Sequence, residues 1–200
     1  MLQAKRSLIS SDGILMTKNN FFFYIFLVTC IIFSRVLFDV INQIEVHFDE
    51  AQYWVWSQNL SLSYLSKGPL VPFLISLSNQ VLGQSYLGLK FFSFVAYLGT
   101  ITTLSLVAFK LSNQKESFYK ALLLSALSPA IFILGGIAST DIFLFFFWSL
   151  TILSYVCFFK DRDEKWFYVI GITVGLGILA KLTMVLLPLS ILLYLSLIHI

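Results

Sequence analysis

Two adjacent acids, Asp49 and Glu50, form the part of the chain best suited to chemistry. They precede an aromatic stretch that contains Tyr53, Trp54 and Trp56. Tyrosine and tryptophan settle at the headgroup level of membranes, so this stretch would hold the carboxylates near a membrane surface. Consecutive helical residues do not face each other. One carboxylate can therefore point into a site while its neighbour caps the helix or holds a metal ion; the alternative is that Asp49 is only an N-cap.

Lysines form the second half of this pattern. Lys67 precedes Gly68-Pro69, a turn of restricted geometry, where an ammonium could hold a phosphate as a point charge. The alternative is a lysine that reaches toward lipid headgroups. Further charges fall at the same predicted level of the membrane, and a substrate with a lipid tail and an anionic head would fit there. These charges are Lys90, Asp141 and Lys181; a lone histidine, His47, lies beside the acids, and a structural or solvated histidine is favoured over a metal ligand.

The composition indicates what must position these residues. Hydrophobic residues make up 58% of the 200 residues, charged residues only 12%, and 21 residues are Phe. A soluble domain needs roughly 25% charged residues to cover its surface. The chain is therefore expected to be an all-α integral membrane protein surrounded by lipids. A soluble enzyme, a disulfide scaffold, a disordered tail and a nucleic-acid-binding module are excluded, so no nucleic-acid partner is expected.

The hydropathy pattern predicts a single membrane domain over 1–200, built as a polytopic bundle of transmembrane helices. No ionisable residue lies mid-span, which counts against a proton relay through the bilayer. Gly171 and Gly175, with Gly177 beyond them, form a small-residue face that predicts close approach of a neighbouring helix. The expected parts are a cytoplasmic tail over 1–20, spans at about 21–38, 86–109, 119–138, 142–159, 166–180 and 182–200, and an extracytoplasmic loop over 39–85 with interfacial helices from Glu50 onward and over 69–82.

The distribution of Lys and Arg predicts the orientation, because basic residues favour the cytoplasmic side. With the N-terminus in the cytoplasm, most of the 13 basic residues lie on that side. The chain then reads as a multi-pass protein of the plasma (inner) membrane whose candidate site faces outward. The cytoplasmic basic residues are Lys5, Arg6, Lys18, Lys110, Lys115, Lys120, Lys160, Arg162 and Lys165.

The ordered motifs resemble those of a known family. They are Asp-Glu before Tyr-Trp-x-Trp, Tyr-x-Ser-Lys-x-Pro-Leu, Leu-Ser-Pro before Ala-Ser-Thr-Asp, and Ala-Lys-x-Thr. Together they resemble the polyprenyl-phosphate-sugar-dependent glycosyltransferases of the GT-C fold. The similarity runs from about Ile41 to Tyr194. The groups that the chain resembles most are the protein O-mannosyltransferases of glycosyltransferase family 39 and the bacterial aminoarabinose transferases that modify lipid A.

This resemblance implies transfer of a sugar, with inversion, from a polyprenyl-phosphate donor to a lipid, glycan or protein acceptor outside the cytoplasm. No cofactor is certain; some relatives use a divalent metal, and Asp49 and Glu50 could hold one with Asp141. A carboxylate base and phosphate-binding lysines suit such a reaction. The implied residues are Asp49, Glu50 and Asp141 for catalysis, Lys67 and Lys181 for the donor phosphate, and Tyr53 and Tyr64 for the donor cavity.

Family members are longer, so the chain is expected to be an N-terminal fragment that need not be active alone. Two other function classes stay open. A transporter or flippase of a lipid-linked anion would use the same lysines to bind a headgroup. A non-catalytic membrane assembly subunit would need neither the acids nor the lysines.

Overall fold

The structure is a computed structural model that describes residues 18–42, 46–64 and 67–199. The described residues form helices and no strands, which confirms the all-α prediction. The elements are α2 (Lys18–Asn42), α3 (Phe48–Gln58), α4 (Leu70–Leu82), α5 (Tyr86–Ser112), α6 (Lys115–Leu127), α7 (Pro129–Leu134), α8 (Thr140–Asp161), α9 (Lys165–Ala180), the 3₁₀ turn η1 (Leu182–Val185) and α10 (Leu186–His199).

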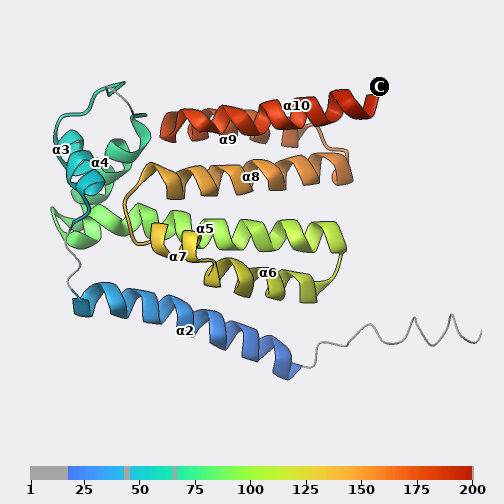
Figure 1. Ribbon diagram of the computed structural model, residues 1–200, viewed down its shortest axis with the longest axis horizontal. Helices are drawn as coiled ribbons and strands as arrows, with labels where there is room; N and C mark the ends of the chain where they lie inside the picture. The colour runs from blue at the N-terminus through green and yellow to red at the C-terminus, as the bar shows by residue number, and fades with distance from the viewer. Residues whose placement is uncertain (1–17, 43–45, 65–66, 200) are drawn as a thin grey trace, which may run out of the picture.

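The long helices lie side by side, and helices α3 and α4 gather at one end of the bundle (Figure 1). Helix α5 packs against α4, α6 and α8, while α8 also packs against α9. We call the end that carries α3 and α4 the site end. The opposite end carries the turns at Asn113–Gln114 and Arg162–Glu164, and we call it the turn end.

Among the residues that the structure describes, two helices, α5 and α8, are long and apolar enough to cross a membrane. They match the spans predicted at 86–109 and 142–159. The span predicted at 119–138 is instead divided between α6 and α7. Pro129 lacks an amide hydrogen and its ring crowds the preceding turn, and Ser128 before it has an extended backbone. The apolar pattern predicted helix over the right segment but did not predict the break between α6 and α7.

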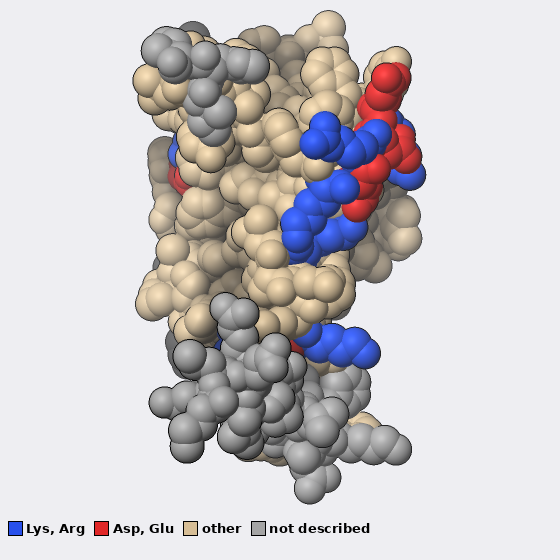
Figure 2. Space-filling model, turned by 90° about the vertical axis from the view of Figure 1, so that its right-hand side faces the viewer, with Lys and Arg blue, Asp and Glu red and all other residues tan. Residues whose placement is uncertain are grey.

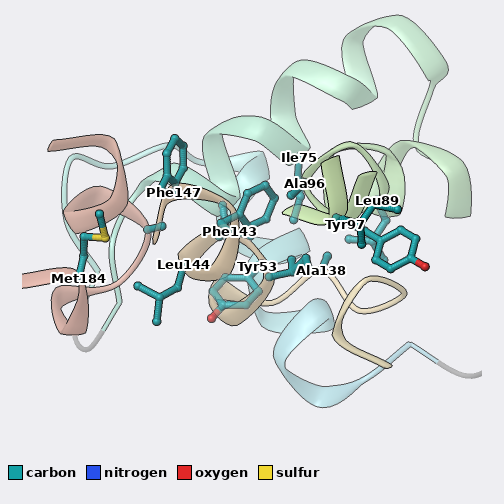
Figure 3. Packing of buried hydrophobic residues seen from close by; sticks show 14 of the residues in the cluster. Tyr53, Ile75, Leu89, Ala96, Tyr97, Ala138, Phe143, Leu144, Phe147 and Met184 are labelled. Carbon is teal, nitrogen blue, oxygen red and sulfur yellow. The ribbon is translucent and has the colours of Figure 1, made fainter. Parts of the chain in front are cut away.

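The core lies where α5 and α8 meet, with Tyr97, Ile101 and Ile142 almost fully buried. Figure 3 shows that residues from the site end, Tyr53 and Ala138, belong to the same packed cluster. Buried hydroxyls add hydrogen bonds between the helices, at 2.9 Å from Thr151 on α8 to Thr173 on α9 and at 2.5 Å between Thr103 on α5 and Ser149 on α8. Each bond of this kind contributes about 0.6 kcal/mol within a bilayer.

Charged side chains gather at the turn end, on the face seen in Figure 2. Lys110 at the end of α5 pairs with Asp161 at the end of α8 at 3.1 Å. Lys165 pairs with Asp163 at 2.6 Å. Pairs this exposed are screened by solvent and add little to stability. They suit solvated turns between helices.

The glycine face predicted on α9 makes a close contact at one of its three glycines, Gly177, and not at the other two. A Cβ added at Gly171 or Gly175 would meet nothing within 4 Å among the described residues. One at Gly177 would come 2.7 Å from the side chain of Met184. Among these three glycines the close contact is at Gly177, and it is made by η1 of the same chain.

Candidate active site

The first turn of α3 orients the two adjacent acids in different directions. His47 is the N-cap: its Nδ1 accepts a hydrogen bond from the Asp49 amide at 3.3 Å. Glu50 completes a capping box, accepting from the His47 amide at 2.9 Å, as an acid three positions after the cap commonly does. The alternative of Asp49 as the N-cap is therefore wrong. The structural role favoured for His47 is the capping role.

Asp49 points toward Lys67, which lies 18 residues further along the chain. The Lys67 Nζ donates to Asp49 Oδ1 at 2.6 Å and to Gln52 Oε1 at 3.3 Å. It also lies 4.7 Å from the centre of the Tyr53 ring. Both charged side chains keep some exposure, 38% for Asp49 and 24% for Lys67, so a ligand can reach them.

The surroundings of Lys67 keep it charged. Burial opposes the ammonium, but the hydrogen bond to Asp49 and the contact with Tyr53 outweigh burial and raise the pKa of Lys67 above its usual value. A lysine already titrates near pH 10.4. Lys67 is therefore a fixed positive charge throughout the neutral range.

Gly68 explains how this lysine is fixed in place. A Cβ at Gly68 would lie 1.8 Å from the carbonyl oxygen of Leu179 and 2.6 Å from its carbonyl carbon. The turn therefore rests directly on the backbone at the end of α9. Only glycine permits this contact, which brings the 67–69 turn beside Lys181.

A second acid–lysine pair completes the arrangement. Asp141 lies in the first turn of α8, and Lys181 is the extended residue between α9 and η1. The Lys181 Nζ donates to Asp141 Oδ1 at 2.5 Å across a separation of 40 residues. The side chain of Lys181 is 36% exposed and that of Asp141 is 41% exposed.

Both pairs line one cavity of about 660 Å³, a size within the usual range of small-molecule sites. Three hydroxyl residues that sequence analysis did not identify also line it. Thr140 and Thr183 stand next to or near charged residues that were identified, so their positions offered a signal. The lining is Asp49, Ser63, Tyr64, Lys67, Gly68, Pro69, Thr140, Asp141, Ile178, Leu179, Ala180, Lys181, Leu182 and Thr183.

The two candidate donor-cavity tyrosines occupy different positions. Tyr64 lines the cavity, and its ring stacks on Trp56 at 4.4 Å. Its hydroxyl accepts from the Ser61 amide at 3.0 Å. Tyr53 is 1% exposed and lies beneath Lys67, outside the lining. Tyr53 therefore supports the lysine from the core, although its sequence context suggested the headgroup level.

Glu50 also lies outside the cavity lining. Its carboxylate oxygens accept from the amides of His47 and Ala138 and lie near Lys90. The Glu50 oxygens therefore do not face Lys67, the partner of Asp49, and the carboxylates of Asp49 and Glu50 do not converge on one point. Within the described ranges, no group of three or more His, Cys, Asp or Glu side chains could hold a metal ion. The residues present do not fit the metal site considered from the sequence.

Comparison with known proteins adds the family. A family model described as dolichyl-phosphate-mannose-protein mannosyltransferase matches residues 66–199. The chain belongs to this family. It is therefore a GT-C glycosyltransferase family member, as the motifs indicated. The matched range contains Lys67, Asp141 and Lys181 but begins after Asp49, so the link between Asp49 and this site comes from its contact with Lys67.

A curated relative is the lipid A galacturonosyltransferase RgtD of Rhizobium johnstonii. It is 32% identical over 139 residues, which cover 66% of this chain. The aligned part spans only 28% of that relative's length. No solved structure gives a significant match to the chain.

The contact at Gly68 leads to a direct prediction. Gly68→Ala should lower stability by about 1–3 kcal/mol, the usual cost of forcing an extra group into a packed site, because the backbone of Leu179 cannot yield easily. It should also displace Lys67. Thermal melting of the detergent-solubilised protein measures the effect. Gly171→Ala is the matched control: its Cβ meets no described atom, and alanine gains about 1 kcal/mol of helix propensity. Equal melting of the Gly68 variant and the wild type would contradict the packing argument.

Proposed function

We propose that the protein transfers a sugar from a polyprenyl-phosphate donor to an acceptor hydroxyl at the extracytoplasmic face of the plasma membrane, with inversion. The observation that carries this proposal is the convergence of two acid–lysine pairs, Asp49–Lys67 and Asp141–Lys181, on one cavity. Family membership supports the reaction class. The acceptor is a lipid, a glycan or a protein, and the name of the lipid A-modifying relative favours a lipid.

The reaction is a single displacement. The acceptor hydroxyl attacks the anomeric carbon, and the bond from that carbon to the phosphate oxygen breaks. The Asp49 carboxylate takes the hydroxyl proton, as a carboxylate base does in inverting sugar hydrolysis. The polyprenyl phosphate leaves with the bonding electrons. Lys67 and Lys181 stabilise its growing negative charge in a site of reduced dielectric.

The resting site has a balanced charge, since each lysine is paired with one acid. An arriving donor phosphate offers the two ammonium groups a shared anionic partner that can compete with Asp49 and Asp141 for them. Moving the lysines toward the phosphate would release Asp49 from its 2.6 Å contact. Donor binding and the freeing of the base would thus occur together. Asp141 would remain beside Lys181 to orient it or the sugar.

The charges of the turn end support the proposed orientation. Its lysines and Arg162 favour the cytoplasm, which agrees with a cytoplasmic N-terminus and a cavity that opens outside. Accessibility labelling tests this topology: single cysteines in the 160–165 turn should react only after the membrane is opened. A cysteine at Ser63, on the cavity rim, should react in intact cells. The opposite pattern would overturn the orientation.

The function is tested with membranes that contain the protein and with polyprenyl-phosphate-linked sugars as donors. The expected result is release of polyprenyl phosphate in a one-to-one ratio with a glycosylated acceptor of inverted anomeric configuration, seen by NMR. Movement of a lipid-linked anion between leaflets without cleavage of its sugar–phosphate bond would support the transporter instead. Absence of both activities, with normal assembly of a partner, would support the assembly subunit.

A further inference from the structure

Glu50 follows Asp49 in the chain but serves a different part of the structure. The residue is 0% exposed and does not line the cavity. A buried carboxylate is tolerated only where hydrogen bonds and an opposite charge compensate for the lost water. The partners of Glu50 reveal what it holds together.

Three segments that are distant in sequence supply those partners. Glu50 Oε2 accepts from the His47 amide at 2.9 Å, within its own helix start. Oε1 accepts from the Ala138 amide at 2.6 Å, in the connection between α7 and α8. The Nζ of Lys90, on α5, lies 3.4 Å from the same oxygen. One side chain therefore joins α3, α5 and the connection that precedes α8.

Lys90 binds the other end of that connection. It is 8% exposed and donates to the Gly136 carbonyl at 2.7 Å. Its ammonium also lies 4.6 Å from the centre of the Tyr86 ring. Glu50 takes the Ala138 amide and Lys90 takes the Gly136 carbonyl, so the pair clamps both ends of the segment 136–138.

This segment leads directly into α8, the helix that carries Asp141. Asp141 follows Ala138 by three residues and lies in the first turn of α8. Asp49 precedes Glu50 directly, in the first turn of α3. The two acids that line the cavity are therefore attached, on separate helices, to the same buried ion pair.

We propose that Glu50 and Lys90 form a buried clamp that sets the position of Asp49 relative to Asp141 across the cavity. Both are positioning residues, since neither lines the cavity. The catalytic consequence rests on the proposed function. A displacement of about 1 Å in a reacting group can cost about 10²-fold in rate, so a clamp between the two acids matters to the turnover rate.

Kinetics of Lys90 variants test the proposal in membranes that contain the protein. Lys90→Met should lower kcat by about 10–100-fold and leave the donor KM within about 3-fold, because Lys67 and Lys181 remain. Lys90→Arg should keep most activity, since a guanidinium can donate to both a carboxylate and a carbonyl. The double variant Glu50→Gln/Lys90→Met should be less impaired than Lys90→Met, because it leaves no unpaired buried carboxylate.

The matched control is Lys120→Met, which removes an exposed i,i+4 pair with Glu116 at the turn end. It should change neither constant. If Lys90→Met does not fold, the Lys90→Arg and double variants still carry the comparison. A Lys90→Met variant with wild-type kcat, or a double variant more impaired than the single one, would overturn the clamp.

Hydrogen-exchange mass spectrometry tests the clamp without any transfer assay. The Ala138 amide is bonded directly to Glu50, so Lys90→Met and Glu50→Gln should each speed exchange in peptides covering both 47–52 and 136–141. Faster exchange in both segments supports the clamp even if the wild type transfers no sugar, a result that would overturn the proposed function alone. Unchanged exchange in either segment would overturn the clamp.

Discussion

Asp49→Asn is expected to lower sugar transfer by about 10²–10⁴-fold, the usual contribution of a positioned general base. Asparagine keeps the shape of the side chain and can still accept from Lys67, which now lies 2.6 Å from Asp49 Oδ1. It cannot take the proton of the acceptor hydroxyl. Donor binding should therefore survive while kcat falls. Initial rates at saturating donor, together with a donor-binding assay, measure the two effects separately.

Asp161→Asn is the matched control for this variant. Asp161 also pairs with a lysine, at 3.1 Å, but it lies at the turn end. Its replacement should leave transfer unchanged. If Asp49→Asn retained transfer within about 3-fold of the wild type, Asp49 would not be the base, because loss of a general base costs far more.

The double variant Lys67→Met/Lys181→Met is expected to have the second large effect, on donor affinity. A hydrogen bond to a charged group contributes about 1.5–3 kcal/mol, so each lysine should account for a loss of about 10–150-fold. The loss is deepened because Asp49 and Asp141 would remain without their cationic partners and repel the donor phosphate. Donor KM and competition by polyprenyl phosphate alone measure the change.

Each single lysine variant should show part of this loss, and Lys110→Met at the turn end should show none. The pH profile supplies a further check. A raised lysine pKa means that the charge is fully present below its usual value and is lost only as pH rises through the higher one. Donor KM should therefore stay flat from about pH 6 to 9 as far as Lys67 determines it. Unchanged donor affinity in the double variant would show that the phosphate binds elsewhere.

The sequence alone could not predict the role of Glu50. The sequence allowed one of the two adjacent carboxylates to cap the helix while the other faced a site. It could not decide which, since both choices satisfy the helix geometry. The amide of Ala138 and the ammonium of Lys90 decide it, and they come from 88 and about 40 residues away. Lys90 was recognised as a charge near the membrane surface, but no local pattern assigned it a partner.

The sequence by itself determined the properties that depend on local composition and period. Apolar runs of span length and the shortage of charge require membrane helices, and the Lys and Arg clusters mark the turns. The ordered motifs identified the family, which the family match confirms. The candidate acids and lysines could also be named from the sequence, because their residue types and loop positions are local features.

Only the tertiary structure decided which of these residues meet. Asp49 contacts Lys67 because Gly68 lets its turn rest on the end of α9. Asp141 contacts Lys181 because α8 and α9 pack side by side. A charge's partner depends on how helices far apart in sequence pack, and hydropathy contains no information about that contact. The sequence thus set the chemical groups of the site, while helix packing set their pairing and the cavity between them.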